Sequence, residues 1–186
     1  EINNAEEAAK TEAALKEAAY VVEKADKKER KRNPLPPYTT SSLQQDAVKK
    51  LNFSTKKTML LAQQLYEGVN VGKGGAVGLI TYMRTDSVRL SDVATAELRS
   101  FIGSTYGAEY VPAGVNVYSS KKNAQDAHEA IRPTSVERTP EAVAQYLTKD
   151  QLKLYTLIWK RTVACQMKAA VYDVTTLLIG AAGYQL

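Results

Sequence analysis

The chain has 186 residues, of which 44% are hydrophobic, and a formal net charge of +5. This composition indicates a globular protein with room for one compact domain and part of another, and it excludes a disordered chain. Cys165 is the only cysteine, which excludes an internal disulfide, and no apolar run approaches the roughly 20 residues that cross a bilayer. The acidic, alanine-rich start lacks a signal-peptide pattern, so we expect a cytoplasmic protein with no membrane partner.

The start of the chain predicts a helix, a strand and a linker. Residues 5–19 are rich in Ala, Glu and Lys with a thin apolar stripe, which is typical of a surface helix. Residues 20–23 change to β-favouring side chains, and residues 27–32 form a basic run broken only by Glu29. The run fits a solvated edge strand better than a contact to a DNA backbone, although both readings stay open. Three prolines in residues 33–37 predict an extended linker and a domain boundary.

Two short helices with a tight turn between them are expected after the linker. Residues 41–45 place two serines ahead of two glutamines at capping-box spacing, and the helix that starts there ends before a turn at residues 52–53. Ser54 caps a second helix that ends at Gly68. Such a helix-turn-helix is more often a core element than a reader of a DNA groove. The glycine-rich residues 72–78 predict a flexible hairpin or wing, because they lack the spacing of a phosphate-binding loop.

Three further helices and a strand are predicted in the second half. Ser91 caps a helix through about residue 102, and residues 115–118 have a strand-like composition. Pro140 begins a short helix, and Thr148 begins a longer one.

The last helix and the C-terminal segment complete the predicted elements. Trp159 lies on the apolar stripe of the helix and is expected in the core, and Cys165 is expected to be a buried, inert thiol. Residues 171–179 alternate as a strand does and could pair with residues 20–23.

A tyrosine and an arginine two residues apart form the first candidate site. Residues 78–87 read GLITYMRTDS, and a short strand over residues 77–80 that continued through Arg84 would point Tyr82 and Arg84 to the same side. Phenols are weak nucleophiles at neutral pH because they ionise only near pH ~10, so a nearby cation would assist attack on phosphorus. Arginine suits this role because its planar fork meets two phosphate oxygens. An ordinary half-exposed tyrosine is nevertheless the commoner explanation of such a pattern.

His128 is the only histidine, and polar residues surround it. Taken by itself, a lone histidine among carboxylates is usually a surface or capping residue. Asp86 could orient either His128 or Arg84, and Arg132 could contact phosphate or brace the loop through Glu129. Metal coordination is not expected, because no second histidine or cysteine stands at ligand spacing.

Three segments resemble the type IA DNA topoisomerases. Residues 78–87 resemble the active-site tyrosine motif of that family, and residues 124–134, AQDAHEAIRPT, resemble the histidine motif that follows it. Residues 33–45, NPLPPYTTSSLQQ, are similar to the entry into the tyrosine-bearing domain. The two long motifs fit the bacterial enzymes better than topoisomerase III, whereas reverse gyrase is less easily excluded.

The resemblance implies a mixed α/β, mainly helical fold. It implies a winged-helix, catabolite-activator-like tyrosine domain over residues 41–168. Residues 1–40, with a helix, a strand and the proline-rich linker, and residues 169–186, with the return strand, would form part of a β-rich arch domain. The chain then looks like a central fragment of a longer enzyme.

The resemblance also implies a function and its residues. Tyr82 would attack single-stranded DNA to give a 5′-phosphotyrosine, and the complete enzyme would pass a strand, religate without ATP and relax negative supercoils on the nucleoid. Magnesium would be bound by a Toprim domain that nothing in this sequence matches, so no metal is expected here. The implied catalytic residues are Tyr82, Arg84 and His128, and the implied DNA-binding residues are Arg84, Asp86, Ser87, Arg132 and Thr134.

Two alternatives come from other classes. A winged-helix DNA-binding module without catalysis would share the charge, the helix pair and the glycine-rich wing, but it would leave the tyrosine and histidine motifs unexplained. A purely structural interaction fragment would have no affinity for DNA. A tyrosine recombinase fits poorly, because its arginine and paired-histidine motifs are missing.

Overall fold

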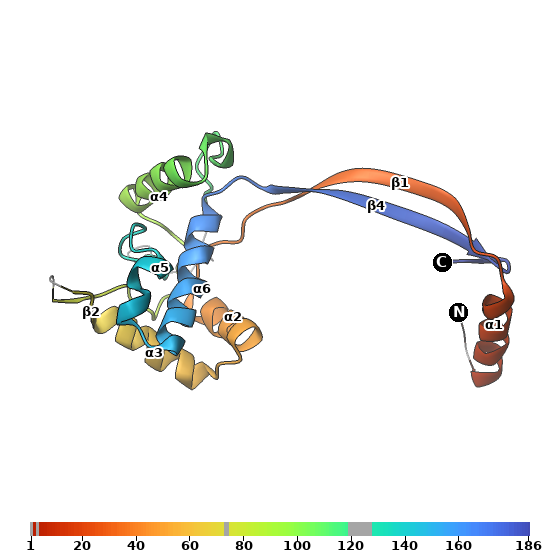
Figure 1. Cartoon of the computed structure of the whole chain (residues 1–186), viewed down its shortest axis with the longest axis horizontal. Coiled ribbons are helices and arrows are strands. Elements are labelled where there is room, and N and C mark those ends of the chain that lie inside the picture. The colour runs from red at the N-terminus through yellow and green to blue at the C-terminus, as the bar shows by residue number, and fades with distance from the viewer. Residues whose placement is uncertain (1, 3, 73–74, 119–127) are drawn as a thin grey trace. The chain divides into compact units, whose positions relative to one another are not determined.

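A computed structural model describes residues 2, 4–72, 75–118 and 128–186, and it divides into two compact units (Figure 1). One unit combines residues 1–32 with residues 170–186, and the other comprises residues 33–169. The described residues form α-helices and small sheets, which confirms the mixed α/β, mainly helical class. No helix in the described part of the chain is long and apolar enough to cross a membrane.

The smaller unit is a helix and a long β-ribbon. α1 (Ala5–Glu17) begins at the side-chain cap Asn4 and buries none of its residues. β1 (Val21–Arg32) pairs antiparallel with β4 (Ala170–Ala181), and the register runs from Val21 opposite Gly180 to Arg32 opposite Ala170. β4 continues into β5 (Tyr184–Gln185).

The strand prediction at the start of the chain was too short. The basic residues 27–32 lie in the same strand as residues 21–22, because β4 offers each of the basic residues a partner in the ladder. Cross-strand pairing thus outweighs the weak β-propensity of lysine and glutamate. The prediction that this run is an exposed edge strand is confirmed, since β1 lies at one side of the sheet and is exposed almost throughout.

In the larger unit, the first two helices begin and end at recognisable caps. α2 (Thr40–Leu51) starts earlier than predicted, because Thr39 rather than Ser41 or Ser42 is the N-cap, and Ser42 closes the capping box in place of a glutamine. Asn52 ends α2 in the left-handed conformation. α3 (Thr55–Glu67) is capped by Ser54 and ends at Gly68, as predicted.

The remaining elements follow the predicted order with one correction. A short hairpin of β2 (Val69–Asn70) and β3 (Ala76–Val77) follows α3. After it come α4 (Asp92–Thr105), the 3-10 turn η1 (Ala108–Tyr110), the short helix α5 (Pro140–Val143), the 3-10 turn η2 (Ala144–Tyr146) and α6 (Lys149–Cys165). The strand predicted over residues 115–118 is absent. Asn116 and Tyr118 instead donate hydrogen bonds to the carbonyl of Cys165, which satisfies the end of α6.

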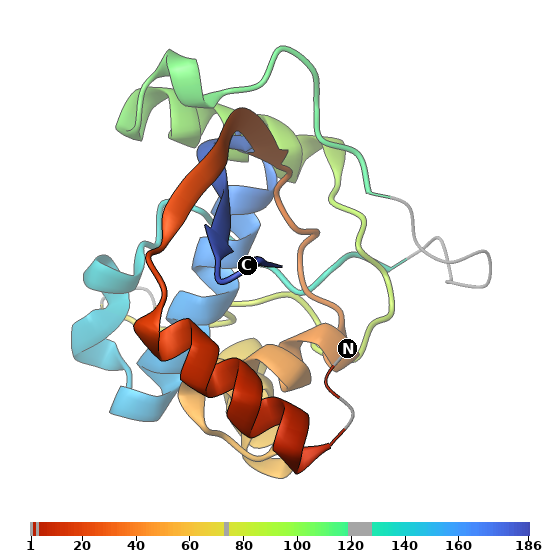
Figure 2. The ribbon, with the colours of Figure 1, turned by 90° about the vertical axis from the view of Figure 1, so that its right-hand side faces the viewer.

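α6 runs through the middle of the larger unit and carries much of its core (Figures 1 and 2). Trp159 is buried as predicted, donates its indole N–H to the carbonyl of Val136 at 2.9 Å, and meets the ring of Phe101 edge-on. Cys165 is fully buried, as predicted, and burial raises the pKa of its thiol to about 12. The surface loops of the larger unit therefore lie on a well-packed core.

Candidate active site

Tyr82 lies on an extended surface segment rather than on a strand. β3 ends at Val77, so the strand predicted to continue through Arg84 is not formed. Most of this segment has no neighbouring strand with which it could form a ladder. Its side chains still alternate with a period of two. Tyr82, Arg84 and Asp86 are exposed, whereas the three residues that alternate with them, Met83, Thr85 and Ser87, are buried.

The tyrosine segment and the histidine segment are bonded side by side. The carbonyl of Leu79 accepts from the amide of Thr134 at 3.0 Å, and the amide of Thr81 donates to the carbonyl of Arg132 at 2.9 Å. The Thr81 hydroxyl donates to the carbonyl of Ala130 at 2.7 Å. These hydrogen bonds join the two segments, which lie about fifty positions apart in the chain, into one surface. The bonded residues of the tyrosine segment directly precede Tyr82.

The proline-rich entry segment joins the same surface. The amide of Thr40 donates to the carbonyl of Thr85 at 2.9 Å, and its hydroxyl donates to the carbonyl of Met83 at 2.7 Å. The amide of Ile131 donates to the carbonyl of Tyr38 at 2.8 Å. All three segments that were singled out in the sequence therefore meet around Tyr82.

Arg132 braces the histidine segment. Its guanidinium donates two hydrogen bonds to Oε2 of Glu129, at 3.1 and 2.7 Å, and a third to the carbonyl of Pro133. Oε1 of Glu129 accepts from the amide of Ser91 at 2.6 Å. Burial alone would raise the pKa of Glu129, but the hydrogen bonds from Ser91 and Arg132 outweigh it and leave that pKa below its usual value. Of the two readings of Arg132, the brace is present, and the phosphate contact stays a prediction.

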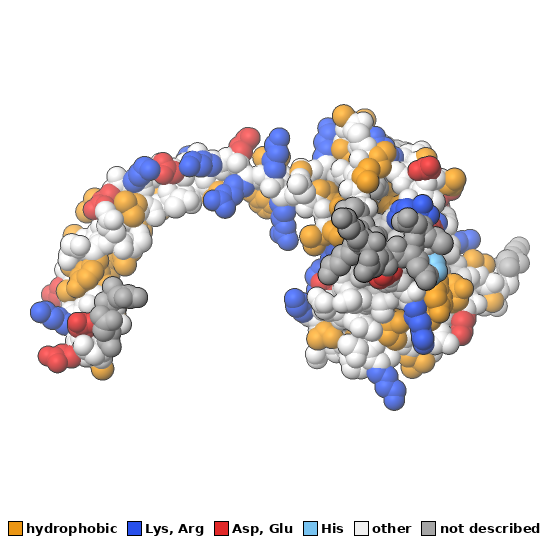
Figure 3. All heavy atoms as spheres, turned by 180° about the vertical axis from the view of Figure 1, so that it is seen from behind, with side chains coloured by type: hydrophobic (Ala, Val, Ile, Leu, Met, Phe, Trp, Pro, Cys, Tyr) orange, Lys and Arg blue, Asp and Glu red, His pale blue; other side chains and the backbone are white. Residues whose placement is uncertain are grey.

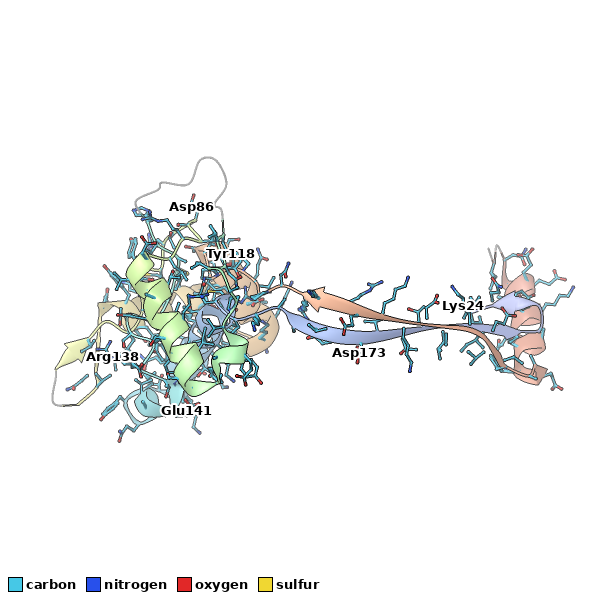
Figure 4. The ribbon with its side chains drawn as sticks, turned by 90° about the horizontal axis from the view of Figure 1, so that it is seen from above. Lys24, Asp86, Tyr118, Arg138, Glu141 and Asp173 are labelled. Carbon is cyan, nitrogen blue, oxygen red and sulfur yellow. The ribbon has the colours of Figure 1, made fainter. Side chains whose placement is uncertain are left out.

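His128 and Asp86 lie at the surface. The histidine side chain is exposed (Figure 3), two residues before Ala130, whose amide is bonded to the carbonyl of Arg89. Asp86 lies at the edge of the unit opposite Glu141 in the view of Figure 4, and it forms no ion pair with the described residues. Residues 124–127 of the histidine motif, which include the polar neighbours Gln125 and Asp126 of His128, lie outside the described residues, whereas the third polar neighbour, Glu129, is paired with Arg132.

Ser87 and Thr134 use their hydroxyl groups to shape the backbone. Ser87 is only 3% exposed, and its hydroxyl accepts from the amide of Arg89 at 3.1 Å. The Thr134 hydroxyl donates to the carbonyl of Gly78 at 2.7 Å. Both residues thus fix the segments around Tyr82, and the DNA contacts expected from them stay predictions.

The structure adds two residues that sequence reasoning did not assign to the site. The ring of Tyr66, at the end of α3, meets the ring of Tyr82 edge-on with 5.2 Å between the centroids. Gly78 lets the chain pass α3 closely, because a β-carbon there would lie 2.6 Å from the Tyr66 carbonyl oxygen. The sequence placed Tyr66 only near the end of the helix predicted between Ser54 and Gly68.

A groove of about 640 Å³ begins at the residues that follow the tyrosine segment in the chain, Val88 to Asp92. It is lined by both charged and apolar groups, among them Arg89, Ser91, Arg99, Asn116 and Tyr118. Arg99 is held by hydrogen bonds to the carbonyls of Pro112 and Gly114, and the lining also includes the acidic Asp92.

Comparison with known proteins agrees with the motifs. Residues 1–186 match the family model for DNA topoisomerase. The chain is 54% identical to DNA topoisomerase 1 of Rickettsia prowazekii over 173 residues, which make up 92% of this chain and 22% of that protein. It is 56% identical to DNA topoisomerase 1 of Xylella fastidiosa strain Temecula1 over 155 residues, or 83% of this chain and 19% of that one.

A solved structure has the same fold. Full-length topoisomerase I from Thermotoga maritima superposes with a TM-score of 0.78 and 45% sequence identity, over 95% of this chain and 27% of that chain. The chain thus spans about a fifth of the length of the curated relatives given above. Because the family model covers every residue of the chain, the resemblance predicted from the three motifs is confirmed, and the chain belongs to the DNA topoisomerase family.

Proposed function

We propose that this chain supplies the tyrosine nucleophile of a type IA DNA topoisomerase. The observation that carries the proposal is the meeting of three separate segments around Tyr82, which leaves its ring 47% exposed on a tightly bonded backbone. A nucleophile must be both reachable and held in position, and this arrangement meets both needs. In this proposal the tyrosine domain predicted over residues 41–168 lies in the larger compact unit, which also takes in the linker residues 33–40, and residues 1–32 and 170–186 form part of the arch domain.

The proposed tyrosine domain is of the winged-helix type. α2 and α3 supply the helix pair, and the two-residue strands β2 and β3 pair antiparallel after them as a small wing would. The helices also share in the core, where Leu43 and Leu65 are fully buried. Their role here is therefore to carry the tyrosine segment, whose Leu79 amide is bonded to the carbonyl of Leu65 at 2.7 Å.

The proposed reaction exchanges one phosphodiester for another. The phenolic oxygen of Tyr82 attacks a phosphorus atom of single-stranded DNA, the new oxygen–phosphorus bond forms, and the bond from phosphorus to the 3′ oxygen breaks. The phenolic proton leaves, and the 3′ oxygen takes up a proton. The 5′-phosphotyrosine keeps the bond energy, so the 3′ hydroxyl reseals the strand without ATP after another strand has passed, which relaxes negative supercoils.

Arg84 and His128 are the proposed partners of Tyr82. Arg84 is exposed on the same side of the alternating segment and would hold two oxygens of the attacked phosphate. His128 is exposed at the start of the bonded histidine segment and would move protons or donate to the phosphate. Asp86, Ser87, Arg132 and Thr134 would place the DNA, the last three largely by shaping the backbone.

Exchanging Arg84 for lysine is expected to reduce DNA relaxation by a full-length topoisomerase carrying this sequence at least about tenfold, because a point charge cannot hold two phosphate oxygens in one plane. The measurement is the initial rate of plasmid relaxation. Arg138→Lys is the control, because Arg138 is half-buried and donates its hydrogen bond to Thr134 rather than to DNA in this proposal. An unchanged rate in Arg84→Lys would show that the fork is not needed.

Magnesium does not fit the described part of this chain. No group of three or more His, Cys, Asp or Glu side chains there could hold a metal ion, and the carboxylates of Glu129 and Asp46 are already paired with arginines. We therefore derive no step through a metal ion. A magnesium site of the complete enzyme would belong to another domain.

The 186-residue chain alone is expected neither to relax a supercoiled plasmid nor to cleave single strands, even when magnesium is added. The chain covers about a fifth of its relatives, and Tyr82 and Arg84 alone lack most of the electrostatic stabilisation that a pentacovalent phosphorane requires. A relaxation gel on the purified chain measures this. Robust relaxation would place the whole catalytic apparatus within these residues and contradict the proposal.

A winged-helix module that binds DNA without chemistry is the alternative. Both proposals expect DNA binding, so affinity does not separate them. Covalent trapping does, because only a nucleophile remains attached to a suicide oligonucleotide after denaturation.

A further inference from the structure

The β1–β4 ribbon carries its charges unequally on its two faces. Successive side chains of a strand point to opposite faces, and residues directly opposite in an antiparallel pair share a face. The register is unbroken from Lys24 to Arg32, so the residues of each face follow from it. The even-numbered residues of β1 and β4 form one face of the ribbon, here called the even face, and the odd-numbered residues form the other, the odd face.

The even face is strongly basic. It combines four basic side chains and one acidic side chain from β1 with five uncharged residues of β4: Lys24, Asp26, Lys28, Arg30 and Arg32, opposite Leu178, Thr176, Val174, Tyr172 and Ala170. Asp26 is paired with Lys24 at 2.7 Å, whereas Lys28, Arg30 and Arg32 form no ion pair with any residue that the structure describes. Figure 3 shows Lys and Arg side chains along the ribbon.

The odd face has balanced charges. It carries the bases Lys27 and Lys31 and the acids Glu29 and Asp173, and these two acids stand opposite each other in the register. Lys24 and Asp173, which lie on different faces, are both labelled in Figure 4. The run of basic residues that appears uniform in the sequence is therefore a cationic stripe on one face only.

Protection of an edge strand does not require this asymmetry. Lysines on either face keep another strand away, and balanced charges do so as well. Same-face neighbours on a strand stand about 6.8 Å apart, so Lys28, Arg30 and Arg32 form a row that can follow a flexible phosphate backbone. Tyr172 lies opposite Arg30 with its ring 49% exposed, which offers a base a surface to stack on.

We propose that the even face of the β1–β4 ribbon is a binding site for single-stranded DNA, separate from the Tyr82 surface. Phosphates contact Lys28, Arg30 and Arg32, and a base stacks on Tyr172. A row of cations beside one exposed aromatic ring fits a single strand, because the bases of a duplex are already stacked on each other. This site does not depend on cleavage, and it goes beyond the proposed nucleophile.

The test compares two pairs of substitutions in the 186-residue chain that remove the same charge from the same strand. Lys28→Gln with Arg30→Gln alters the even face, and Lys27→Gln with Lys31→Gln is the control on the odd face. Fluorescence anisotropy with a labelled oligothymidine is measured over a range of salt concentrations. The even-face pair is expected to make the slope of log affinity against log salt shallower by about 1.4, since each single-strand phosphate contact contributes about 0.7. The control pair is expected to change it by less than half as much.

Two further variants show which side chains are responsible for a change in DNA binding. Tyr172→Leu is expected to weaken binding about fivefold or more with little change in the salt slope, because stacking releases no counterions. Tyr82→Phe is expected to leave the slope unchanged, so loss of the proposed nucleophile and loss of this site are distinguishable. Circular dichroism checks the fold of every variant.

Three results would overturn the proposal. Equal changes in the two double variants would mean that only bulk charge matters. An unchanged slope in the even-face pair would remove the phosphate contacts. Duplex DNA that binds as tightly as the single strand, together with no effect of Tyr172→Leu, would contradict the assignment of a single strand.

Discussion

Substituting phenylalanine for Tyr82 in a full-length topoisomerase carrying this sequence is expected to abolish DNA cleavage and relaxation. The change removes one oxygen atom, which is the proposed nucleophile, and leaves the ring that packs edge-on against Tyr66. Residual activity is expected to be at least about a thousandfold below wild type, because no neighbouring group can form the same ester. Relaxation rate and yield of covalent complex are the two measurements.

The folding of this variant should change little, since the side chain is about half exposed and no hydrogen bond holds its hydroxyl among the described residues. Tyr106→Phe is a suitable control. Tyr106 is also exposed in the larger unit and also meets a neighbouring ring, that of Phe101, so the same atom is removed from a similar setting. If both variants lost activity equally, the effect would not be specific to the nucleophile.

Asp46→Ala is expected to destabilise the larger unit by roughly 2–4 kcal/mol, because it leaves the largely buried Arg161 without its carboxylate partner. Oδ2 of Asp46 accepts from the Tyr38 hydroxyl at 2.6 Å, from Lys50 at 2.8 Å and from Arg161 at 2.6 Å. The Arg161 guanidinium also lies 4.3 Å from the centre of the Tyr38 ring. Urea unfolding of the 186-residue chain measures the loss.

Asp150→Ala is the control for this prediction. Asp150 forms an ion pair with Lys57 at 2.6 Å, but both side chains are well exposed, so its removal should cost much less. Equal losses in the two variants would show that burial of the Asp46 cluster does not determine its contribution.

The same carboxylate should make stability depend on pH. Burial would raise the pKa of Asp46, but hydrogen bonds from Lys50 and Tyr38 and the charge of Arg161 outweigh it and lower that pKa in the folded state. A group with a lowered folded pKa stabilises the protein above its unfolded value, which is about 3.9, and this stability is lost as the pH falls through the folded value. The difference in unfolding free energy between wild type and Asp46→Asn should therefore shrink below about pH 4.

Local signals in the sequence were sufficient for most helices. Ser54, Ser91 and Thr148 each mark a helix start, because a side-chain oxygen that accepts a backbone N–H is needed there and leaves a readable pattern. Exposure of Tyr82 and Arg84 on one side also followed from the two-residue period. The regular strand that was expected to produce this period is missing, because extended backbone can alternate without a ladder.

Most non-local pairing was beyond the reach of the sequence, although the predicted pairing of residues 171–179 with residues 20–23 is confirmed by β1 and β4. The bonds from Thr81 to Ala130 and Arg132 join residues about fifty positions apart, and nothing local at Thr81 indicates them. The edge contact of Tyr66 with Tyr82 depends on the close approach of Gly78, which read only as part of a flexible loop. The full length of β1 was missed for the same reason, since the ladder partners of its residues lie between 138 (Arg32–Ala170) and 159 (Val21–Gly180) positions away along the chain.

The most direct test of the central claim is to identify the residue that becomes attached to DNA. A full-length topoisomerase carrying this sequence is incubated with a suicide oligonucleotide, denatured and digested, and the DNA-linked peptide is sequenced by mass spectrometry. We expect one adduct, on Tyr82, joined to the 5′ phosphate of the cleaved strand. An adduct on any other residue, or one on the 3′ phosphate, would contradict it.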